Sequence, residues 1–190
     1  MTGIVILAAG RGSRLKTICP KALQCLGGYP LLDHILAKLP KVPTYIIINP
    51  ENQALFPKRD HITYLYQKNP NGTGDALIQN IDTLIEHESL IVLNGDTPFV
   101  PRSLIQQLIS HSESNILVGF KTEDPKQYGQ IIYENNLATA IVEMKDIKKK
   151  VSSTCYSGVM KISSQYLQKL TTIAPSKATG EYYLTSIVSN

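Results

Sequence analysis

Cysteine is scarce in this sequence of 190 residues, and long apolar runs are missing. The three cysteines, Cys19, Cys25 and Cys155, form no Cys-x-x-Cys pair and are odd in number, so we expect neither a disulfide framework nor a zinc site. This cysteine usage suits a reducing compartment such as the cytoplasm. No apolar run approaches membrane-spanning length, and the apolar stretch at the N-terminus is too short for a signal peptide, so we expect no membrane partner and no processing.

Charge is also modest, because charged residues make up 18% of the chain and the net charge is +4. This small positive excess suits phosphorylated small molecules and requires no nucleic acid. The one basic cluster, residues 145–150, has no aromatic residue among its lysines, so we interpret it as a solvated loop rather than a nucleic-acid surface. Hydrophobic residues make up 43%, which is a globular composition, and the length fits one domain over residues 1–190.

Short, β-branched apolar runs alternate with amphipathic stretches in the first part of the chain. This alternation is typical of strands buried on both faces and joined by crossover helices, so we predict an α/β fold with a parallel sheet. Pro30 and Pro101 stand where two of the helices would begin. The predicted strands are residues 4–7, 45–48, 62–66, 90–93 and 116–118, and the predicted helices between them are 32–39, 77–85 and 104–109.

The pattern changes after about residue 120. Residues 128–136 and 137–146 are predicted to be two strands joined by an Asn-Asn turn, which we interpret as a small antiparallel lid insertion along one edge of the sheet. Residues 155–162 could supply a further strand, and 165–170 and 182–188 two final helices. The expected fold is a single Rossmann-like three-layer domain with a mostly parallel central sheet.

The most informative stretch is residues 7–21, LAAGRGSRLKTICPK, in which a predicted buried strand leads directly into two glycines and then cations. Glycines there let backbone N–H groups approach a phosphate chain closely, although a plain tight turn is an alternative. Leu15 occupies the place of the third glycine of a GxGxxG dinucleotide motif, and no GxxxxGK[ST] phosphate loop is found. The stretch therefore disfavours an ordinary NAD-binding or P-loop protein.

Several longer motifs follow in order along almost the whole chain. After LAAGxGSRL and PKAL come NGTGDAL (71–77), NGDTPF (94–99), YGQI (128–131), IVEMKD (141–146) and TGEYYLT (179–185). With these motifs the chain resembles the sugar-nucleotide pyrophosphorylases, and it is most similar to the uridylyltransferase domain of the bifunctional N-acetylglucosamine-1-phosphate uridylyltransferases. The resemblance implies a Rossmann-like core and Mg²⁺-dependent transfer from UTP to a sugar-1-phosphate, giving a UDP-sugar and pyrophosphate.

The resemblance also implies which residues bind the nucleotide. Arg14 would contact the β- and γ-phosphates, and Lys21 the α-phosphate and the incoming sugar phosphate. Gln67, with the backbone of Gly72 and Thr73, would read the pyrimidine edge, for which the donor and acceptor of a carboxamide are suited. The residues implied for the nucleotide-binding turn are Leu7, Ala8, Ala9, Gly10 and Gly12.

Asp96 is the implied magnesium ligand. It lies just beyond the end of a predicted buried strand, where open α/β sheets bind ligands, and Mg²⁺ prefers oxygen ligands, although an Asx turn before Pro98 is an alternative. No Ser/His/Asp arrangement is needed, since this chemistry depends on positioning and charge neutralisation, and we expect no catalytic role for the four histidines. The residues implied for the sugar pocket are Gly95, Tyr128, Gly129, Glu143, Tyr156 and Glu181.

Three departures from the family pattern leave alternatives open. Tyr156 stands where the N-acetylglucosamine enzymes have Asn, and Asp75 where they usually have His. The chain ends at Asn190, before the further Asn that completes the family's metal site, and it has no hexapeptide repeats, so we expect no acetyltransferase domain. The alternatives are another sugar phosphate or phosphocholine as acceptor, another pyrimidine nucleotide, and a catalytically weak nucleotide-binding regulatory protein. The sequence indicates no oligomeric state.

Overall fold

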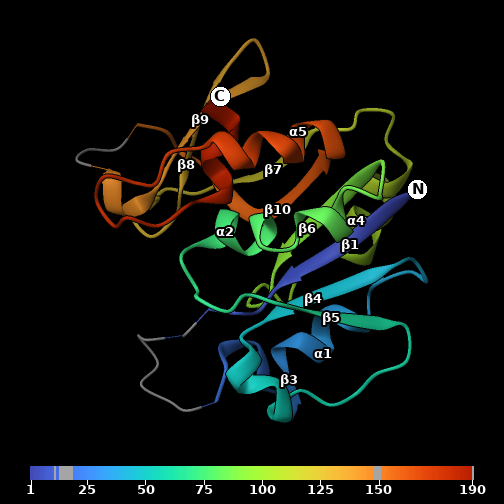
Figure 1. Cartoon of the computed structure of the whole chain (residues 1–190). Coiled ribbons are helices and arrows are strands. Elements are labelled where there is room, and N and C mark those ends of the chain that lie inside the picture. The colour runs from blue at the N-terminus through green and yellow to red at the C-terminus, as the bar shows by residue number, and fades with distance from the viewer. Residues whose placement is uncertain (11, 13–18, 148–150, 190) are drawn as a thin grey trace.

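A mixed sheet with helices on both faces forms the body of the molecule in the computed structural model, which describes residues 1–10, 12, 19–147 and 151–189 (Figure 1). Within those residues eight strands make one sheet, and two more form a short separate ribbon. The sheet strands are β1 (Thr2–Leu7), β4 (Thr44–Ile48), β5 (Ile62–Tyr66), β6 (Ser89–Asn94), β7 (Ile116–Lys121), β8 (Gln130–Glu134), β9 (Leu137–Val142) and β10 (Thr154–Ser163). The ribbon consists of β2 (Cys25–Leu26) and β3 (Tyr29–Pro30).

The parallel half of the sheet has the order β5-β4-β1-β6. Leu7 at the end of β1 lies opposite Ile47 of β4 on one side and Asn94 of β6 on the other. Each of these strands was predicted from its apolar run to within two residues at either end. The prediction succeeds for β1, β4 and β6 because strands buried on both faces consist mostly of Ile, Val and Leu. β5, at the edge of the sheet, is only partly buried.

The predicted strand at residues 116–118 is confirmed as part of β7, but its neighbour in the sheet is antiparallel. β7 is longer than predicted and pairs with β10, with Ile116 opposite Lys161 and a register shift between Tyr156 and Val159. Because β10 lies between β6 and β7 and is antiparallel to both, β7 runs in the same direction as the parallel strands but is separated from them, which a three-residue apolar run does not reveal.

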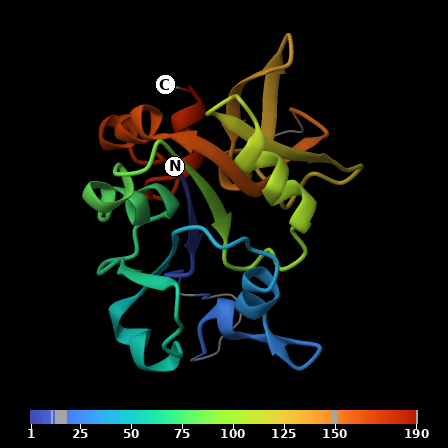
Figure 2. The same ribbon diagram turned by 90° about the vertical axis from the view of Figure 1, so that its right-hand side faces the viewer.

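The predicted lid hairpin is confirmed. β8 pairs antiparallel with β9, and the two residues between them, Asn135 and Asn136, have φ values of 49° and 64°. Asparagine tolerates this left-handed conformation, which a two-residue hairpin turn requires. β8 joins the sheet through Cys155 of β10, opposite Gln130. In both side views the hairpin stands at the end of the molecule opposite β5 (Figures 1 and 2).

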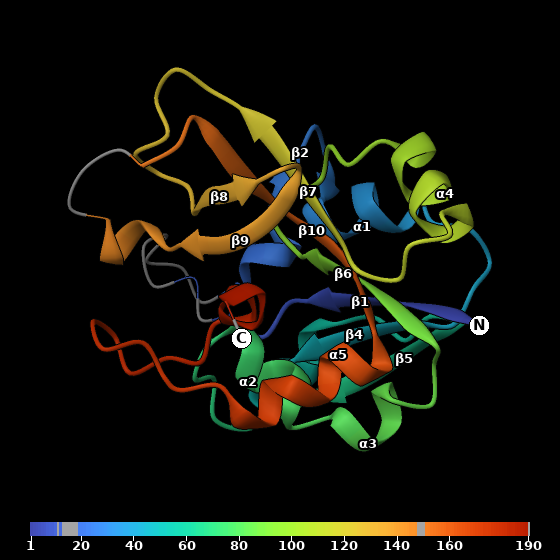
Figure 3. The ribbon, with the colours of Figure 1, turned by 90° about the horizontal axis from the view of Figure 1, so that it is seen from above.

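Helices cover both faces of the sheet, as seen from above in Figure 3. α1 (Leu31–Leu36) and α4 (Arg102–Ser110) lie on one face; α2 (Thr73–Ile78), α3 (Ile81–Leu84) and α5 (Ser164–Gln168) lie on the other. Pro30 and Pro101 directly precede α1 and α4, as predicted. The helix predicted over 77–85 is interrupted at Asn80, whose side chain donates to the carbonyls of Tyr66 and Ala76. The last predicted helix is the 3₁₀ helix η6 (Leu184–Ser189).

Side chains of β1 alternate between the two cores. Ile4 and Ile6 pack with the α1 and α4 side, whereas Val5 packs with the α2 and α5 side, and all three are fully buried. Burying an aliphatic side chain of this size stabilises the fold by about 1.5–3 kcal/mol. β1 is therefore anchored from both sides, and the turn that follows it has a rigid base.

Among the described residues no helix is long and apolar enough to cross a membrane.

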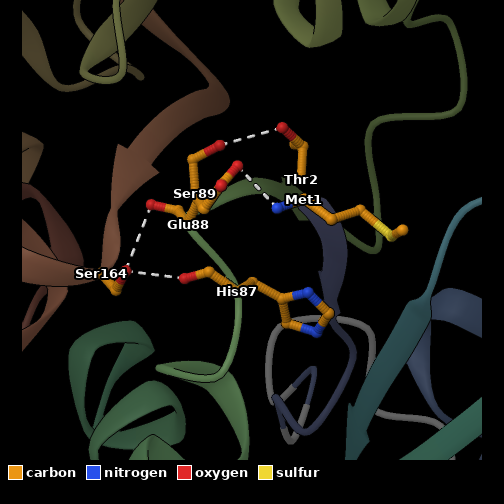
Figure 4. A network of polar contacts seen from close by, with 6 residues as sticks. All are labelled: Met1, Thr2, His87, Glu88, Ser89 and Ser164. Carbon is orange, nitrogen blue, oxygen red and sulfur yellow. Dashed lines mark hydrogen bonds and ion pairs between the residues drawn. The ribbon is translucent and has the colours of Figure 1, made fainter.

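A polar network ties the amino-terminal edge of the sheet together (Figure 4). The Met1 ammonium lies 2.6 Å from Glu88 Oε2, which lowers the pKa of the Glu88 carboxyl, and the Thr2 and Ser89 hydroxyls lie 3.0 Å apart. The Ser164 hydroxyl donates to the His87 carbonyl over 2.6 Å. These contacts join β1, β6 and α5 at the edge opposite the carboxyl ends of the parallel strands.

Candidate active site

A cavity of about 590 Å³ lies at the carboxyl ends of β1, β5 and β6. Its volume is within the usual range for small-molecule sites, and open α/β sheets bind ligands at this edge where the strand order reverses. Here the reversal is at β1, from which the chain first continues to β4 and β5 and later returns to β6 on the other side. The described lining residues are Leu7, Ala8, Ala9, Gly10, Gly12, Lys21, Ala22, Gln67, Pro70, Gly72, Thr73, Ala76, Asn94, Gly95, Asp96, Glu181 and Tyr183.

The turn after β1 forms one wall of the cavity. The backbone N–H of Ala8 still donates to the Ile47 carbonyl over 2.8 Å, so the turn departs from the sheet only after this residue. Gly12 has a φ of +55°, and a Cβ atom there would lie 3.6 Å from Lys21 Cβ. All five residues predicted for the nucleotide-binding turn line the cavity. Arg14, predicted to contact phosphates, lies outside the described residues.

A cation and a carboxylate form an ion pair in the cavity wall beside that turn. Lys21 Nζ forms an ion pair with Asp96 Oδ2; the lysine side chain is 47% exposed and the aspartate side chain 33%. Lys21 begins the 3₁₀ helix η2 (Lys21–Leu23), and Asp96 follows β6 by two residues. The pair comes from segments 75 residues apart, and both members line the cavity. We refer to it as the Lys21–Asp96 pair.

Gly95 permits this close arrangement. Its backbone N–H donates to the Leu7 carbonyl over 2.9 Å, and a Cβ atom on Gly95 would lie 2.8 Å from that same carbonyl oxygen. Any side chain would therefore separate the end of β6 from the end of β1. Gly95, predicted for the sugar pocket, lies at the base of the glycine turn and lines the cavity.

Gln67 and α2 form the other end of the cavity. Gln67 is 3% exposed, follows β5 directly, and its Nε2 donates to the Gly72 carbonyl over 3.0 Å and to Asp75 Oδ2 over 2.6 Å. Thr73, which begins α2, accepts a hydrogen bond at Oγ1 from the Leu184 backbone over 3.0 Å. The predicted base-reading residues are thus brought together, with Asp75 as an additional partner.

The segment at Tyr182 docks against the start of α2 through backbone contacts. Its N–H donates to the Asn71 carbonyl over 2.9 Å, and its carbonyl accepts from the N–H of Gly74 over 2.8 Å. Gly72 lies at a φ of +104°, and a Cβ there would be 2.3 Å from the Tyr182 carbonyl oxygen. This contact brings Glu181 and Tyr183 into the cavity wall.

Gly72→Ala should lower the free energy of unfolding by about 2–4 kcal/mol, because it adds backbone strain to a collision with backbone atoms that cannot rotate away. Gly180→Ala is the matched control: Gly180 also has a positive φ, of +73°, but a Cβ atom there would meet nothing within 4 Å. Chemical denaturation of both variants tests this. Equal losses for the two would mean that the docked Tyr182 segment contributes nothing.

The remaining predicted sugar-pocket residues form a cluster under the lid, beside the cavity rather than in its lining. The Tyr156 backbone N–H donates to the Gly129 carbonyl over 2.8 Å, and a Cβ on Gly129 would lie 3.6 Å from Glu143 Oε2. The Tyr128 ring packs edge-on against Phe120, with centroids 4.9 Å apart, and is 43% exposed. Of the six residues predicted for the sugar pocket, only Gly95 and Glu181 line the cavity.

Glu143 is the carboxylate with which several residues of this cluster interact. The Thr185 hydroxyl donates to its Oε1, which connects the lid to η6. Burial raises the pKa of the Glu143 carboxyl, and the nearby Asp146 and Glu181 act in the same direction. The pKa of the Tyr156 phenol is raised by burial and by Glu143, so this hydroxyl keeps its proton at neutral pH. Lys145 lies 3.9 Å from Glu181 and joins the cluster to the cavity wall.

Glu143→Gln should remove a pH-dependent loss of stability. Because the folded-state pKa is above the unfolded value of about 4.3, the stabilisation from this group is complete below that value and is lost as the pH rises through the folded-state pKa. The melting temperature of E143Q should therefore gain on the wild type between about pH 4 and pH 7. Glu134→Gln, at an exposed position in β8, is the control. Parallel stability curves for E143Q and wild type would contradict the assignment.

Comparison with known proteins supplies the family. A family model described as the MobA-like NTP transferase domain matches residues 4–156. The chain belongs to this family. It is 34% identical over 197 residues to the bifunctional protein GlmU of Buchnera aphidicola subsp. Baizongia pistaciae, and 33% identical over 200 residues to that of Rhodospirillum rubrum. These matches cover 98% and 99% of the chain but 44% and 45% of the relatives, so the chain spans less than half of their length.

Two solved structures have the same fold as this chain. A Bacillus anthracis protein assigned as a glucose-1-phosphate thymidylyltransferase, in complex with sucrose, superposes with a TM-score of 0.82 at 25% identity, covering 98% of this chain and 81% of that one. A UDP-glucose pyrophosphorylase complexed with UDP-glucose superposes with a TM-score of 0.80 at 17% identity, over 100% and 86% of the two chains. The second likeness concerns the fold alone. The predicted Rossmann-like nucleotidyltransferase fold is confirmed.

Sequence reasoning missed several residues of the cavity wall. Asn94 and Tyr183 both stand inside recognised motifs, NGDTPF and TGEYYLT, but other members of those motifs were selected. The Tyr183 hydroxyl lies 2.7 Å from Thr179 Oγ1, and burial raises the pKa of the Tyr183 phenol. Ala22 and Ala76 have small apolar side chains with no chemical group that could be recognised in the sequence as part of a site. Within the described lining of the cavity there is no histidine.

Proposed function

We propose that this domain transfers a uridylyl group from UTP to a sugar-1-phosphate, giving a UDP-sugar and pyrophosphate. The observation that carries the proposal is one cavity with the Lys21–Asp96 pair at one end and the Gln67 carboxamide at the other. N-acetylglucosamine-1-phosphate is our first choice of acceptor, because the motifs resemble those of the domain that uses it. The nucleotidyltransferase family of the chain and its likeness to GlmU sequences support the reaction class.

The two ends of the cavity suit the two ends of a nucleotide. Neighbouring strands lie about 4.8 Å apart, so the ends of β5 and β6, three positions apart in the sheet, are separated by roughly 14 Å. The phosphates belong beside Lys21, and the base beside Gln67, where the described lining residues carry no cation. Backbone N–H groups of the glycine turn lie between, where they can approach the phosphate chain.

The reaction is an in-line substitution at phosphorus. An oxygen of the sugar-1-phosphate forms a bond to the α-phosphorus of UTP as the bond to the bridging oxygen of the β-phosphate breaks, and that electron pair leaves with pyrophosphate. Lys21 offsets the negative charge that develops on the oxygens around the α-phosphorus and holds the acceptor phosphate against it. No nucleophilic side chain is required, because the acceptor phosphate is itself the nucleophile.

The donor set beside Lys21 fits magnesium only together with substrate. Among the residues that the structure describes, no three His, Cys, Asp or Glu side chains form a group that could hold a metal. Mg²⁺, however, commonly uses one or two carboxylates and completes its octahedron with water and substrate phosphates. Asp96 supplies such a carboxylate at the cavity wall. When bound, the ion would neutralise phosphate charge during transfer.

The acceptor sugar would lie between Glu181 and the lid cluster. Glu143, held by Thr185, offers a carboxylate for sugar hydroxyls, and the Gly129 backbone lies next to it. Tyr156 fills the position where the N-acetylglucosamine enzymes carry Asn, and its protonated phenol can donate a hydrogen bond but is bulkier than a carboxamide. We therefore expect any difference between this domain and its relatives to lie first in which sugar-1-phosphate it accepts.

A pyrophosphate-release assay tests the proposal directly. UTP, CTP and dTTP are each incubated with Mg²⁺ and one acceptor from a panel of sugar-1-phosphates and phosphocholine. We expect release with UTP and N-acetylglucosamine-1-phosphate. Release with another acceptor alone would move the substrate but keep the chemistry. No release with any pair, from protein that binds UTP, would contradict the proposed activity and favour a nucleotide-binding regulatory protein.

A further inference from the structure

The orientation of one carboxamide in the cavity is dictated by its neighbours. Gln67 is 3% exposed, and its backbone N–H donates to the Ile48 carbonyl over 2.9 Å, so the residue is anchored at both its backbone and its side chain. Both hydrogens of its amide nitrogen are used: Nε2 donates to the Gly72 carbonyl over 3.0 Å and to Asp75 Oδ2 over 2.6 Å. The side chain is therefore held on its nitrogen side only.

These two partners allow no other orientation. A backbone carbonyl and an ionised carboxylate are acceptors that carry no hydrogen to donate. If the carboxamide of Gln67 turned by 180°, its Oε1 would face both of these oxygens at hydrogen-bond distance. Such oxygen pairs repel each other, and each buried polar group would lose its partner. The nitrogen therefore has to occupy this position.

Asp75 is in turn held by a second glutamine. Gln79 Nε2 donates to the same Oδ2 of Asp75 over 2.7 Å, while Gln79 Oε1 accepts from the backbone N–H of Lys68 over 2.9 Å. Because a backbone N–H can only donate, the orientation of Gln79 is fixed as well. Two amides thus converge on one carboxylate, and Asp75 is the residue on which the orientation of Gln67 depends.

One atom of this network is left for a ligand. Within the residues that the structure describes, no hydrogen bond is donated to Gln67 Oε1, although the side chain is almost fully buried and lines the cavity. Oε1 is not among the buried side-chain atoms of the described residues that are left without a partner, so it is open to the cavity, where water can donate to it before a ligand binds. Because Oε1 is held in place as an acceptor, a ligand group that replaces this water has to be a donor.

We propose that Asp75 is a positioning residue that makes the nucleotide site prefer uracil or thymine to cytosine, by holding Gln67 with only its acceptor toward the base. The inference rests on the proposed function, because it takes the ligand to be a pyrimidine nucleoside triphosphate. Ring nitrogen N3 of uracil and thymine carries a hydrogen, which Oε1 accepts. N3 of cytosine carries a lone pair, which the fixed Oε1 repels. Specificity then comes from a repulsive contact as well as an attractive one.

Nucleotide binding, measured by calorimetry on the full chain, tests this without requiring turnover. UTP, dTTP and CTP are titrated with Mg²⁺ present into wild type, Asp75→Ala and Asp75→Asn. Wild type should bind UTP and dTTP more tightly than CTP. In D75A the amide loses one of its two acceptors and can present either end to the base, so the ratio of UTP to CTP affinity should fall by about tenfold, the effect of one hydrogen bond.

The asparagine variant separates positioning from a general structural effect. Its side-chain oxygen can accept from both glutamines in place of the carboxylate, so D75N should keep most of the wild-type preference. Asp82→Ala, at an exposed position in α3, is the control and should leave the ratio unchanged. Weaker binding of all three nucleotides by D75A with an unchanged ratio would overturn the inference, since that is what loss of helix stability alone would produce.

The outcomes also distinguish this inference from the proposed function. If wild type prefers UTP and D75A keeps the same ratio, the role of Asp75 is refuted and the uridylyl-transfer proposal stands. If wild type binds UTP but releases no pyrophosphate with any acceptor, the activity is refuted, and the affinity ratios still decide the role of Asp75. If wild type binds no pyrimidine nucleotide, both are refuted.

Discussion

Lys21→Ala should lower kcat/KM for UDP-sugar formation by about 10²–10³, the size of effect found when one preorganised charge-stabilising donor is removed from an active site. Lys21 is the cation that the described part of the cavity presents to phosphate, and its ammonium is held at the cavity wall by Asp96. Because the charge it offsets is greatest in the transition state, most of the loss should be in kcat rather than in the KM for UTP. Steady-state kinetics with varied UTP and sugar-1-phosphate measure this.

Two further variants sharpen the test. Lys21→Arg keeps the charge but replaces a compact ammonium by a planar fork, so it should recover only part of the activity. Lys58→Ala removes an exposed lysine outside the cavity lining and should match wild type. If K21A retained wild-type kcat, the ion pair with Asp96 would be structural, and the phosphate end of the site would have to lie elsewhere.

Asp96→Ala should also lower kcat by about 10²–10³, together with a large rise in the Mg²⁺ concentration needed for half-maximal activity. Asp96 is the carboxylate that pairs with Lys21 in the cavity wall, and it is our proposed metal ligand. Asp96→Asn keeps the shape and one oxygen but loses the charge, so it should be intermediate in its Mg²⁺ requirement. Activity measured over a series of Mg²⁺ concentrations, with EDTA as the zero point, gives both quantities.

The two substitutions should not be additive. Removing Asp96 leaves the Lys21 ammonium without its partner, so part of the effect of D96A comes from a displaced lysine. The double variant should therefore lose much less than the product of the two single losses. Asp60→Ala, an exposed acid beyond the cavity lining, is the control. An unchanged Mg²⁺ requirement in D96A would contradict its role as a metal ligand.

Strands β1, β4 and β6 of the parallel half could be predicted because they are buried on both faces. Ile4, Ile46 and Leu93, for example, come from separate apolar runs and are all fully buried in one core. The antiparallel neighbour of β7 could not be predicted, because pairing with β10 is a contact between distant segments that a three-residue run does not encode. Asn80 likewise divides a continuous helical periodicity through side-chain bonds to backbone carbonyls.

The convergence of several predicted residues on one cavity could be predicted for a physical reason. Residues that follow parallel strands meet at one edge of the sheet, so the glycine turn, Gln67 and Asp96 had to converge. The positions of Tyr156 and Glu143, both predicted for the sugar pocket, could not be predicted. Tyr156 lies in β10 where its pairing with β7 is irregular, Glu143 follows β9, and neither lines the cavity. The Asp75 contact with Gln67 also escaped prediction, since it joins a strand end to a helix side chain.

The most direct test of the central claim follows the phosphorus atoms of the nucleotide. UTP labelled with ³²P at the α-position is incubated with Mg²⁺ and the accepted sugar-1-phosphate, and the products are separated. Attack at the α-phosphorus predicts that all transferred label is in the UDP-sugar and that the pyrophosphate is unlabelled. Label in UDP, with the γ-phosphate transferred to the sugar phosphate or to water, or label in UMP, from attack of water at the α-phosphorus, would contradict nucleotidyl transfer to the sugar at this site.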